Sequence, residues 1–319
     1  MCVNFLLGKS GEFVLSGTIL DHDSRIQSRF VPVVAGTEIK INDEKGITLW
    51  NYVTKYGFVG LNIAGKPFYK DALNSEGLSV SAQWMEETVY EKAEDYPHKK
   101  PIPYVYLIVF ALGSCRNTLE VKELLNSHTF YLINVKGMGR KFPLHLIFHD
   151  REKRSLLVEF LNGKTHFHDF PVMTNNPPFE IQHKKLKEYQ EVVSKDPALA
   201  GIRGIAKVLD DAYNDERFLM LCWLNEMVEE SKSLKEAVAN CFRILGRLDI
   251  TYHENDMDYK KIGKVSNLWS TVTDHVNLKI YFRTYDNQQI RMIDVVKCLT
   301  ERKRFINIAS GDWYQEILP

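Results

Sequence analysis

The second residue of the chain, Cys2, is the cysteine best placed for chemistry. If the initiator Met1 is removed, Cys2 becomes the amino-terminal residue and carries both a thiol and a free α-amine. An α-amine has a pKa of about 7.7 to 8.0 and a thiol about 8.5, so near neutral pH the amine can take the thiol proton directly or through a water molecule. A blocked amine cannot do this. Removal of Met1 therefore decides whether Cys2 is a nucleophile or an idle cysteine.

The remaining cysteines are interpreted as reduced core residues, because their surroundings are apolar and the cysteine spacing matches no zinc site. They are Cys115, Cys222, Cys241 and Cys298. His166 and His168 alternate as in a strand and would place both imidazoles on one face, but an exposed strand or turn explains this pair better than a metal site does. We expect neither a metal nor a cofactor.

Charge and hydropathy exclude two classes of partner. The chain has 41 basic and 41 acidic residues, so it lacks the clustered positive charge that nucleic acids or anionic membranes require. The longest apolar run, from Val105 to Leu112, is shorter than the ~18 to 20 residues that span a bilayer. No signal peptide is recognisable after Met1. A cytoplasmic protein is expected, with a trimmed export signal as the alternative.

The start of the chain predicts a hairpin that holds Cys2 inside a sheet. Residues 2–7 and 12–16 have the composition of strands, and Gly8 to Gly11 form the turn between them. The segment from Gly17 to Asp21 follows directly, so the carboxylate of Asp21 would lie back beside Cys2. A turn residue at a strand end is the alternative interpretation of Asp21.

The rest of the chain alternates between strands and helices. The pattern predicts strands and turns over 25–85, helices over 104–112 and from an N-cap at Thr118 to about 125, strands within 129–161, a helical region over 183–245, and strands at 269–273, 278–284 and 290–293. No repeat or flexible linker divides the chain. Strands from both ends bracket a helical middle, which predicts a single domain over 1–319, of α+β class, in which early and late strands share sheets.

Six segments, taken in order, resemble the choloylglycine hydrolase and penicillin V acylase family of N-terminal nucleophile hydrolases. They are Met1-Cys2, Gly17 to Asp21, Tyr56 to Asn62, Asn74 to Val80, Met173 to Pro177, and Tyr281 to Asn287. The resemblance implies a four-layer αββα sandwich, with two antiparallel sheets packed between helical layers. It also implies hydrolysis of a linear amide C–N bond through an acyl-thioester.

Carried onto this chain, the resemblance implies catalytic roles for Cys2, Asp21, Asn175 and Arg203. Cys2 would be the nucleophile and, through its amine, the general base, and Asp21 would accept hydrogen bonds from that amine or thiol. Asn175 would donate its side-chain amide to the oxyanion. Arg203 occupies the approximate place of a supporting arginine, although a solvent-facing helix arginine explains it equally well.

The resemblance also points to residues of an oxyanion hole and an acyl pocket. A backbone N–H near Ala82 or Gln83 would be the second oxyanion donor. Trp84, Phe58 and Tyr69 are expected to line the acyl pocket, with ordinary core packing as the alternative. Gln83 stands where related enzymes commonly carry an apolar or aromatic pocket residue.

One position departs from the family pattern. The family usually has an arginine beside the thiol at position 18, where its charge favours the thiolate, but this chain has Thr18. Arg25 or Arg203 would have to supply that charge. A catalytically weak or silent homologue that binds a ligand or partner is therefore the alternative to an amidohydrolase.

The expected substrates join an apolar acyl or aryl-acyl group to a small polar amine through an amide. A conjugated bile salt, penicillin V or an N-acyl amino compound fits this description. A proenzyme that cleaves itself before an internal cysteine fits poorly, since only Met1 precedes Cys2. The resemblance further suggests a homo-oligomer.

Overall fold

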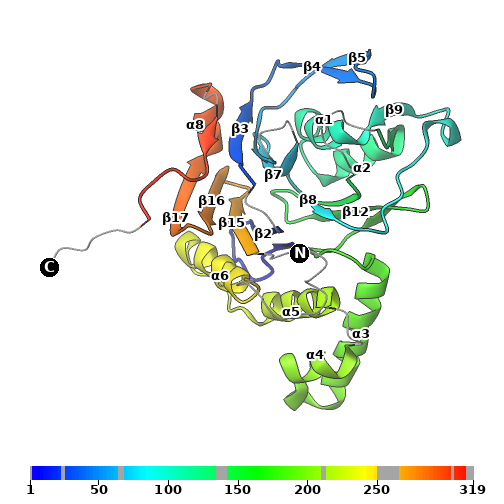
Figure 1. The fold of residues 1–319 in the computed structure, drawn as a ribbon. Helices are drawn as coiled ribbons and strands as arrows, with labels where there is room; N and C mark the ends of the chain where they lie inside the picture. Colours follow the sequence, from blue (N-terminus) through cyan, green and yellow to red (C-terminus); the bar gives the residue numbers. More distant parts are fainter. Residues whose placement is uncertain are drawn as a thin grey trace.

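Two antiparallel sheets lie face to face at the centre of the structure, and helices cover the outer face of each (Figure 1). The structure is a computed structural model, and it describes residues 2–22, 26–63, 68–133, 142–209, 213–249, 266–302 and 305–313. This arrangement is the αββα sandwich predicted from the sequence resemblance, and the prediction is confirmed.

The first sheet has six strands and combines the two ends of the chain. Its order is β14 (Val172–Met173), β1 (Val3–Leu6), β2 (Leu15–His22), β15 (Ser266–Asp274), β16 (Lys279–Thr284) and β17 (Asn287–Asp294). Strand β2 therefore pairs with a strand almost 250 positions later, as the early and late strand patterns predicted.

The second sheet has eight strands and contains mainly the first half of the chain. Its order is β13 (Lys164–His168), β12 (Ser155–Leu161), β11 (Leu144–His149), β8 (Ser79–Trp84), β7 (Tyr69–Asn74), β6 (Phe58–Asn62), β3 (Arg29–Val33) and β18 (Ile306–Asn307). Two smaller sheets pair β4 (Glu38–Asn42) with β5 (Thr48–Val53), and β9 (Lys100–Pro103) with β10 (His128–Tyr131).

The helices fall into two groups, one for each outer layer. Helices α1 (Leu107–Ser114) and α2 (Thr118–Ser127) lie over the eight-stranded sheet, whereas the helical middle of the chain lies on the side of the six-stranded sheet (Figure 1). That middle comprises α3 (Phe179–Lys195), α4 (Ile202–Val208), α5 (Tyr213–Met227) and α6 (Leu234–Gly246); the short α8 (Val295–Thr300) follows β17. No helix of the described residues is long and apolar enough to cross a membrane.

Alternation along the strands separates the core into three layers. Val3 and Phe5 of β1 pack toward α5 and α6, while Cys2 packs between the two sheets with Leu20 and Trp269. On the eight-stranded sheet, residues such as Phe58 pack toward α1 and α2. Because successive side chains in a strand point to opposite faces, each sheet contributes to two of these cores.

One predicted helix cap is wrong. Thr118 is the first residue of α2, and Asn117 is the cap whose side chain accepts a hydrogen bond from the Glu120 N–H. The Thr118 hydroxyl instead donates to a carboxylate oxygen of Asp150 at 2.8 Å. Asn117 and Thr118 both have side chains that cap helices well, but the Thr118 side chain binds Asp150, so Asn117 is the cap.

Candidate active site

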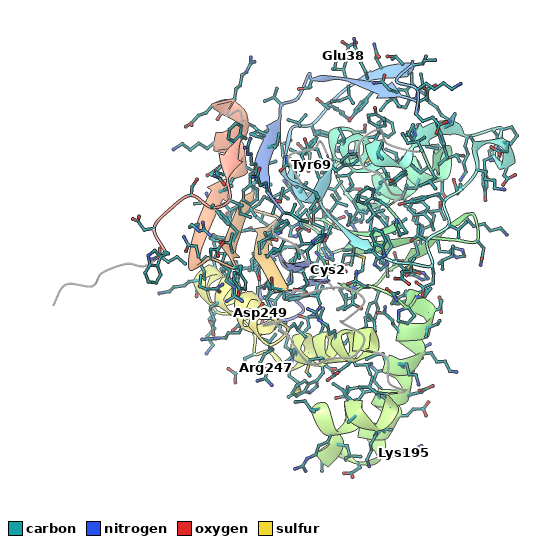
Figure 2. The ribbon with its side chains drawn as sticks, in the orientation of Figure 1. Cys2, Glu38, Tyr69, Lys195, Arg247 and Asp249 are labelled. Atoms are coloured by element: carbon teal, nitrogen blue, oxygen red, sulfur yellow. The ribbon has the colours of Figure 1, made fainter. Side chains whose placement is uncertain are left out.

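Cys2 lies just before β1, near the middle of the view in Figure 2, and the pairing of Val3 with Ile19 places it near the end of β2. Its side chain is 6% exposed and belongs to the core between the sheets. Its thiol is 4.0 Å from the backbone carbonyl oxygen of Asp21, to which it donates a weak hydrogen bond. This contact is made by the backbone of Asp21, so the placement of its carboxylate beside Cys2 stays a prediction.

The pairing of β1 with β2 depends on a residue without a side chain. Gly17 lies opposite Phe5 in the register, and a Cβ atom at Gly17 would meet a ring carbon of Phe5 at 2.5 Å. No real Cβ contact is that short, so only glycine lets the Phe5 ring cover β2 at this position. The same register carries Cys2 to the level of Leu20, next to Asp21.

Asn175 contacts the backbone of Cys2 directly. The Cys2 nitrogen donates to Asn175 Oδ1, and Asn175 Nδ2 donates to the carbonyl oxygen of Trp84 at 2.6 Å. An amide nitrogen has two donor hydrogens, and the described residues use one of those of Asn175. One N–H of Asn175 therefore stays available beside Cys2.

The carboxylate of Asp21 forms a buried ion pair. Arg217 of α5 places Nη1 2.7 Å from Asp21 Oδ2, and its Nη2 donates to the carbonyl of Leu248 at 2.9 Å. Both side chains are almost fully buried. A buried carboxylate needs such a partner, because water no longer stabilises its charge.

Arg217, and not the predicted Arg203, is the arginine that contacts Asp21. Arg203 lies on the short helix α4 and is exposed, whereas Arg217 contacts Asp21. The sequence did carry a signal for Arg217: it directly precedes the apolar run that begins at Phe218, on a helix face that must be buried. An arginine on such a face needs a charged or carbonyl partner in the interior.

Thr18 takes part in a polar network between the sheets. Its hydroxyl accepts a hydrogen bond from Asn4 Nδ2 at 2.6 Å, and Asn4 Oδ1 lies 2.7 Å from His149 Nε2. Burial, with the neighbouring His275, holds the pKa of His149 well below its usual range, so the ring is neutral. Since Asn4 Oδ1 can only accept, His149 carries its proton on Nε2 and accepts at Nδ1 from Ser155. Arg25, the other candidate source of positive charge, lies outside the described residues.

The residues predicted for the oxyanion hole and acyl pocket divide into two groups. The side chains of Phe58, Ala82 and Tyr69 pack toward α1 and α2, on the face of the sheet that is turned away from Cys2. The expected place of Phe58 and Tyr69 in an acyl pocket beside the thiol is therefore corrected. The backbone N–H of Ala82 or Gln83 as a second oxyanion donor stays a prediction.

Gln83 and Trp84 do reach the site. Trp84 is half-buried, and its carbonyl holds Asn175. Gln83 is 1% exposed, and with its amide oriented to satisfy all its neighbours, its nitrogen donates to the carbonyls of Cys2 at 3.2 Å and Thr174 at 3.1 Å. Gln83 thus contacts the backbone of Cys2.

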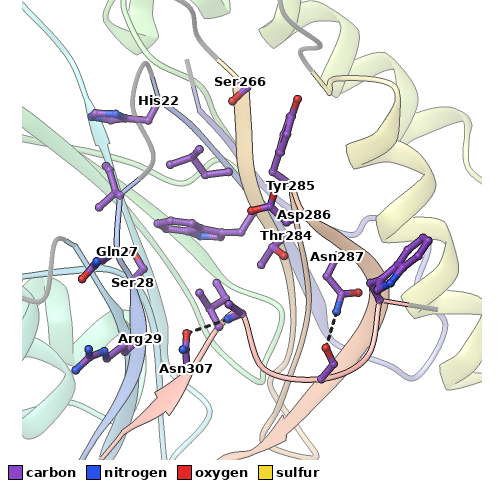
Figure 3. Close-up of a pocket in the computed structure, with 17 residues that line it drawn as sticks. His22, Gln27, Ser28, Arg29, Ser266, Thr284, Tyr285, Asp286, Asn287 and Asn307 are labelled. Atoms are coloured by element: carbon purple, nitrogen blue, oxygen red, sulfur yellow. Dashed lines mark hydrogen bonds between the residues drawn. The ribbon is translucent and has the colours of Figure 1, made fainter. Parts of the chain in front are cut away.

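A separate cavity of about 520 Å³ opens at the same end of the sandwich (Figure 3). It lies at the end of β2, at His22, and at the beginning of β15, and Trp269 contributes to its wall. Cys2, Phe58 and Trp84 are not among its lining residues. Trp269 packs in the same core cluster as Cys2, so the cavity approaches the core around the thiol through Trp269 but has no described lining contact with the thiol itself.

Three of the other thiols are chemically quiet. Burial raises the pKa of Cys115 to about 12, helped by the nearby Glu120 and Glu123, and burial also raises the pKa of Cys222 and of Cys241 far above neutrality. A thiol must lose its proton to act as a nucleophile. These cysteines are core residues, as the sequence predicted.

A sequence profile of the linear amide C-N hydrolases, choloylglycine hydrolase family, matches residues 5–301. The chain belongs to this family. It is therefore a member of a family of amidohydrolases that act on linear amides, as the resemblance predicted. The choloylglycine hydrolase family also accounts for the layered fold.

Named relatives agree with the family assignment. The chain is 24% identical over 281 residues to penicillin V acylase of Pectobacterium atrosepticum, covering 82% of this chain and 72% of the relative. It is 26% identical over 259 residues to a bile salt hydrolase/transferase of Lactiplantibacillus plantarum, covering 75% of this chain and 78% of the relative.

Solved structures of the choloylglycine hydrolase family share the fold. The C2A mutant of the conjugated bile acid hydrolase from Clostridium perfringens matches with a TM-score of 0.81 and 20% identity, covering 100% of this chain and 99% of that one. Penicillin V acylase from Agrobacterium tumefaciens matches with a TM-score of 0.75 and 20% identity, covering 93% and 87%. At this identity the likeness extends to the fold alone.

Proposed function

We propose that the chain hydrolyses a linear amide with Cys2 as the nucleophile, after removal of Met1. The observation that carries the proposal is the contact of the Cys2 nitrogen with Asn175, whose second amide N–H is unused within the described part of the chain. Nucleophile, amine and oxyanion donor thus belong to two residues in contact. The chemically quiet Cys115, Cys222 and Cys241 further support Cys2 as the reactive thiol.

In the first half of the reaction, the thiol proton of Cys2 passes to its own α-amine, and the sulfur forms a bond to the carbonyl carbon of the amide. The carbonyl oxygen becomes an oxyanion and accepts a hydrogen bond from Asn175 Nδ2. The C–N bond then breaks, and the ammonium returns the proton to the departing amine. An acyl-thioester on Cys2 and a free amine result.

In the second half, the regenerated α-amine takes a proton from water while the water oxygen attacks the thioester carbonyl. The carbon–sulfur bond breaks, the carboxylic acid leaves, and the proton returns to the thiolate. Asp21 accepts hydrogen bonds from the amine or the thiol in this proposal, and Arg217 holds its carboxylate in place. The negative charge of Asp21 also favours the protonated amine that forms in each half.

The substrate class follows from the relatives. One of them is named penicillin V acylase and another bile salt hydrolase/transferase, so an apolar acyl or aryl-acyl group on a small polar amine is the substrate class that we propose. Penicillin V and a glycine-conjugated bile salt represent its two acyl types. Hydrolysis of one of these two compounds by the protein would identify the acyl class that it accepts.

The test is the mass of the amino-terminal peptide after brief exposure to each of these amides, with an acid quench. We expect loss of Met1 and an acyl adduct on Cys2, and no turnover in a Cys2→Ala variant. A Cys222→Ala variant is the matched control, since Cys222 is a half-buried thiol in α5, and it should turn over at the wild-type rate. Met1 retained on protein from its native host, with Cys2 unmodified, would sink the hydrolase proposal and leave a binding protein on a hydrolase fold.

A further inference from the structure

Two buried glutamines contact the segment that carries Asn175 from opposite sides. Gln83 reaches it from strand β8 of the eight-stranded sheet, and Gln182 reaches it from the first turn of α3. Both side chains are almost fully buried, at 1% and 3% exposed. Neither belongs to the chemistry proposed above, so their role needs a separate account.

Gln182 spans the loop that leads from β14 into α3. Its Nε2 donates to the carbonyl of Asn175 at 2.7 Å and to that of Pro177 at 2.5 Å, and its Oε1 accepts from the Thr174 hydroxyl at 3.0 Å. Helical side chains lean toward the amino terminus of their helix, so a glutamine in the first turn naturally covers the preceding loop. All of its amide hydrogens and its oxygen are used.

Gln83 joins the same segment to the nucleophile. In the satisfied orientation, its nitrogen donates to the carbonyls of Thr174 and Cys2, and its oxygen accepts from the Asn4 N–H at 3.3 Å. One amide group therefore binds the backbone at the start of β1 and at the end of β14, two strands that pair with each other. Gln83 and Gln182 meet at Thr174, one through its carbonyl and the other through its hydroxyl.

The start of α3 is itself fixed. Glu159 of β12 accepts a hydrogen bond from the Phe179 N–H at 2.9 Å. Burial would raise the pKa of Glu159, but the nearby His145 and His168, with nitrogens 3.6 and 3.5 Å from its oxygens, lower it to about 2, so the carboxylate stays charged. A charged acceptor at a helix amino terminus is favourable, and it anchors the helix from which Gln182 projects.

We infer that Gln83 and Gln182 are positioning residues that set the distance and orientation between the Cys2 thiol and the Asn175 amide. The inference rests on the function proposed above. An oxyanion donor works only within a few tenths of an ångström of the developing charge, so it must be held by groups whose own rotamers are locked. Six hydrogen bonds from two buried amides provide that constraint without contact with the substrate.

The main test is a kinetic cycle with Gln182→Met and Asn175→Ala, using the representative amide that the wild-type protein turns over fastest. Gln182→Met should lower kcat roughly 10- to 100-fold with little change in KM, because the lost interaction acts in the transition state. In the Asn175→Ala background the same change should cost less than about threefold, since the donor to be positioned is gone. Gln190→Met, on an exposed position of the same helix, is the matched control and should have wild-type kinetics.

A second variant keeps the test valid if Gln182→Met folds poorly. In Gln182→Glu, the protonated carboxyl can donate to the loop carbonyls, whereas the ionised form repels them. The ratio of its kcat to that of the wild type should therefore fall as pH rises through the pKa of the introduced carboxyl. A pH-independent ratio, or an equal loss from Gln182→Met with and without Asn175, would show that Gln182 acts only through general stability.

A readout that needs no turnover separates this inference from the proposed function. Gln83→Met should speed amide hydrogen exchange in peptides covering 2–6 and 172–177, and Gln182→Met should do so in 172–177 alone. Gln190→Met should change neither peptide. Unchanged exchange in both glutamine variants would overturn the inference even if Cys2 is the nucleophile. If the protein turns over no amide but shows these exchange changes, the proposed function is wrong, whereas Gln83 and Gln182 still hold the segments that carry Cys2 and Asn175.

Discussion

The polar groups between the two sheets differ at the two ends of that layer. At the end formed by the β7–β8 turn, His275 donates from Nδ1 to the Gly77 carbonyl and accepts at Nε2 from Ser16, so both ring nitrogens are satisfied. At the other end, the Cys2 thiol has one long contact and Asn175 keeps one N–H without a partner in the described residues. A buried polar group that is fully paired stabilises the fold, whereas one with spare capacity can act on a ligand.

Asn4 connects the two ends. Its backbone N–H contacts Gln83, and its side chain joins Thr18 to His149. Thr18 is thus joined through Asn4 to the fully paired histidine network, although the family pattern has an arginine beside the thiol at position 18. The comparison predicts that changes near Cys2 affect turnover and that changes near the histidines affect stability.

The largest expected effect is the loss of the buried ion pair at the active-site end. Arg217→Leu leaves the Asp21 carboxylate buried without this cation, which should destabilise the protein by about 3–5 kcal/mol. Chemical denaturation measures this change. Arg203→Leu, on an exposed position, should stay within about 0.5 kcal/mol of wild type. Equal losses of stability in the two variants would show that the ion pair of Arg217 with Asp21 does not stabilise the site.

Removing the oxyanion donor should affect turnover more than stability. Asn175→Ala should lower kcat about 10²- to 10³-fold, equivalent to about 2.7–4 kcal/mol, with a small change in KM. Steady-state kinetics on the amide that the wild type hydrolyses measures it. A rise in KM with unchanged kcat would instead make Asn175 a ground-state binding residue.

Thr18 gives the sharpest contrast between the two ends. Thr18→Val keeps the shape but removes the acceptor of the Asn4 amide, so a buried donor loses its partner. We expect a loss of about 1–3 kcal/mol in the free energy of unfolding, with kcat within about threefold of wild type. A much larger drop in kcat at unchanged stability would place Thr18 in the chemistry after all.

The last contrast is the pH dependence that the paired histidines impose. Burial lowers the pKa of both His149 and His275 in the folded protein, so the unfolded chain binds protons at a higher pH than the folded one. Stability is therefore complete above the unfolded pKa of about 6.5 and falls as pH drops below it. Each histidine contributes a slope of up to about 1.4 kcal/mol per pH unit.

Denaturation between pH 7 and 5 measures that slope. His275→Gln should flatten the curve, since it removes one of the two neutral buried rings. His98→Gln is the control, because His98 is exposed. An unchanged slope in His275→Gln would mean that the acid sensitivity comes from other groups.

The sequence by itself indicated the family and the layered fold, because six segments in order resemble the choloylglycine hydrolases. Strand alternation and turn residues predicted the α+β class, and Cys2 as the nucleophile stays a prediction. The hairpin that carries Cys2 and the meeting of Cys2 with Asp21 were predictable because the turn and strand lengths fix the register. The single domain over 1–319, the homo-oligomer and the cytoplasmic location stay predictions.

Only the tertiary structure decided which residues support the site. Arg217 reaches Asp21 across 196 positions, and Gln182 and Gln83 meet at Thr174 from different layers of the sandwich. The face on which Phe58 lies also depends on how the two sheets stack. Alternation in one strand says that two faces differ, but it does not say which face meets the other sheet. Pairing between distant segments sets that choice, and a local pattern carries no information about it.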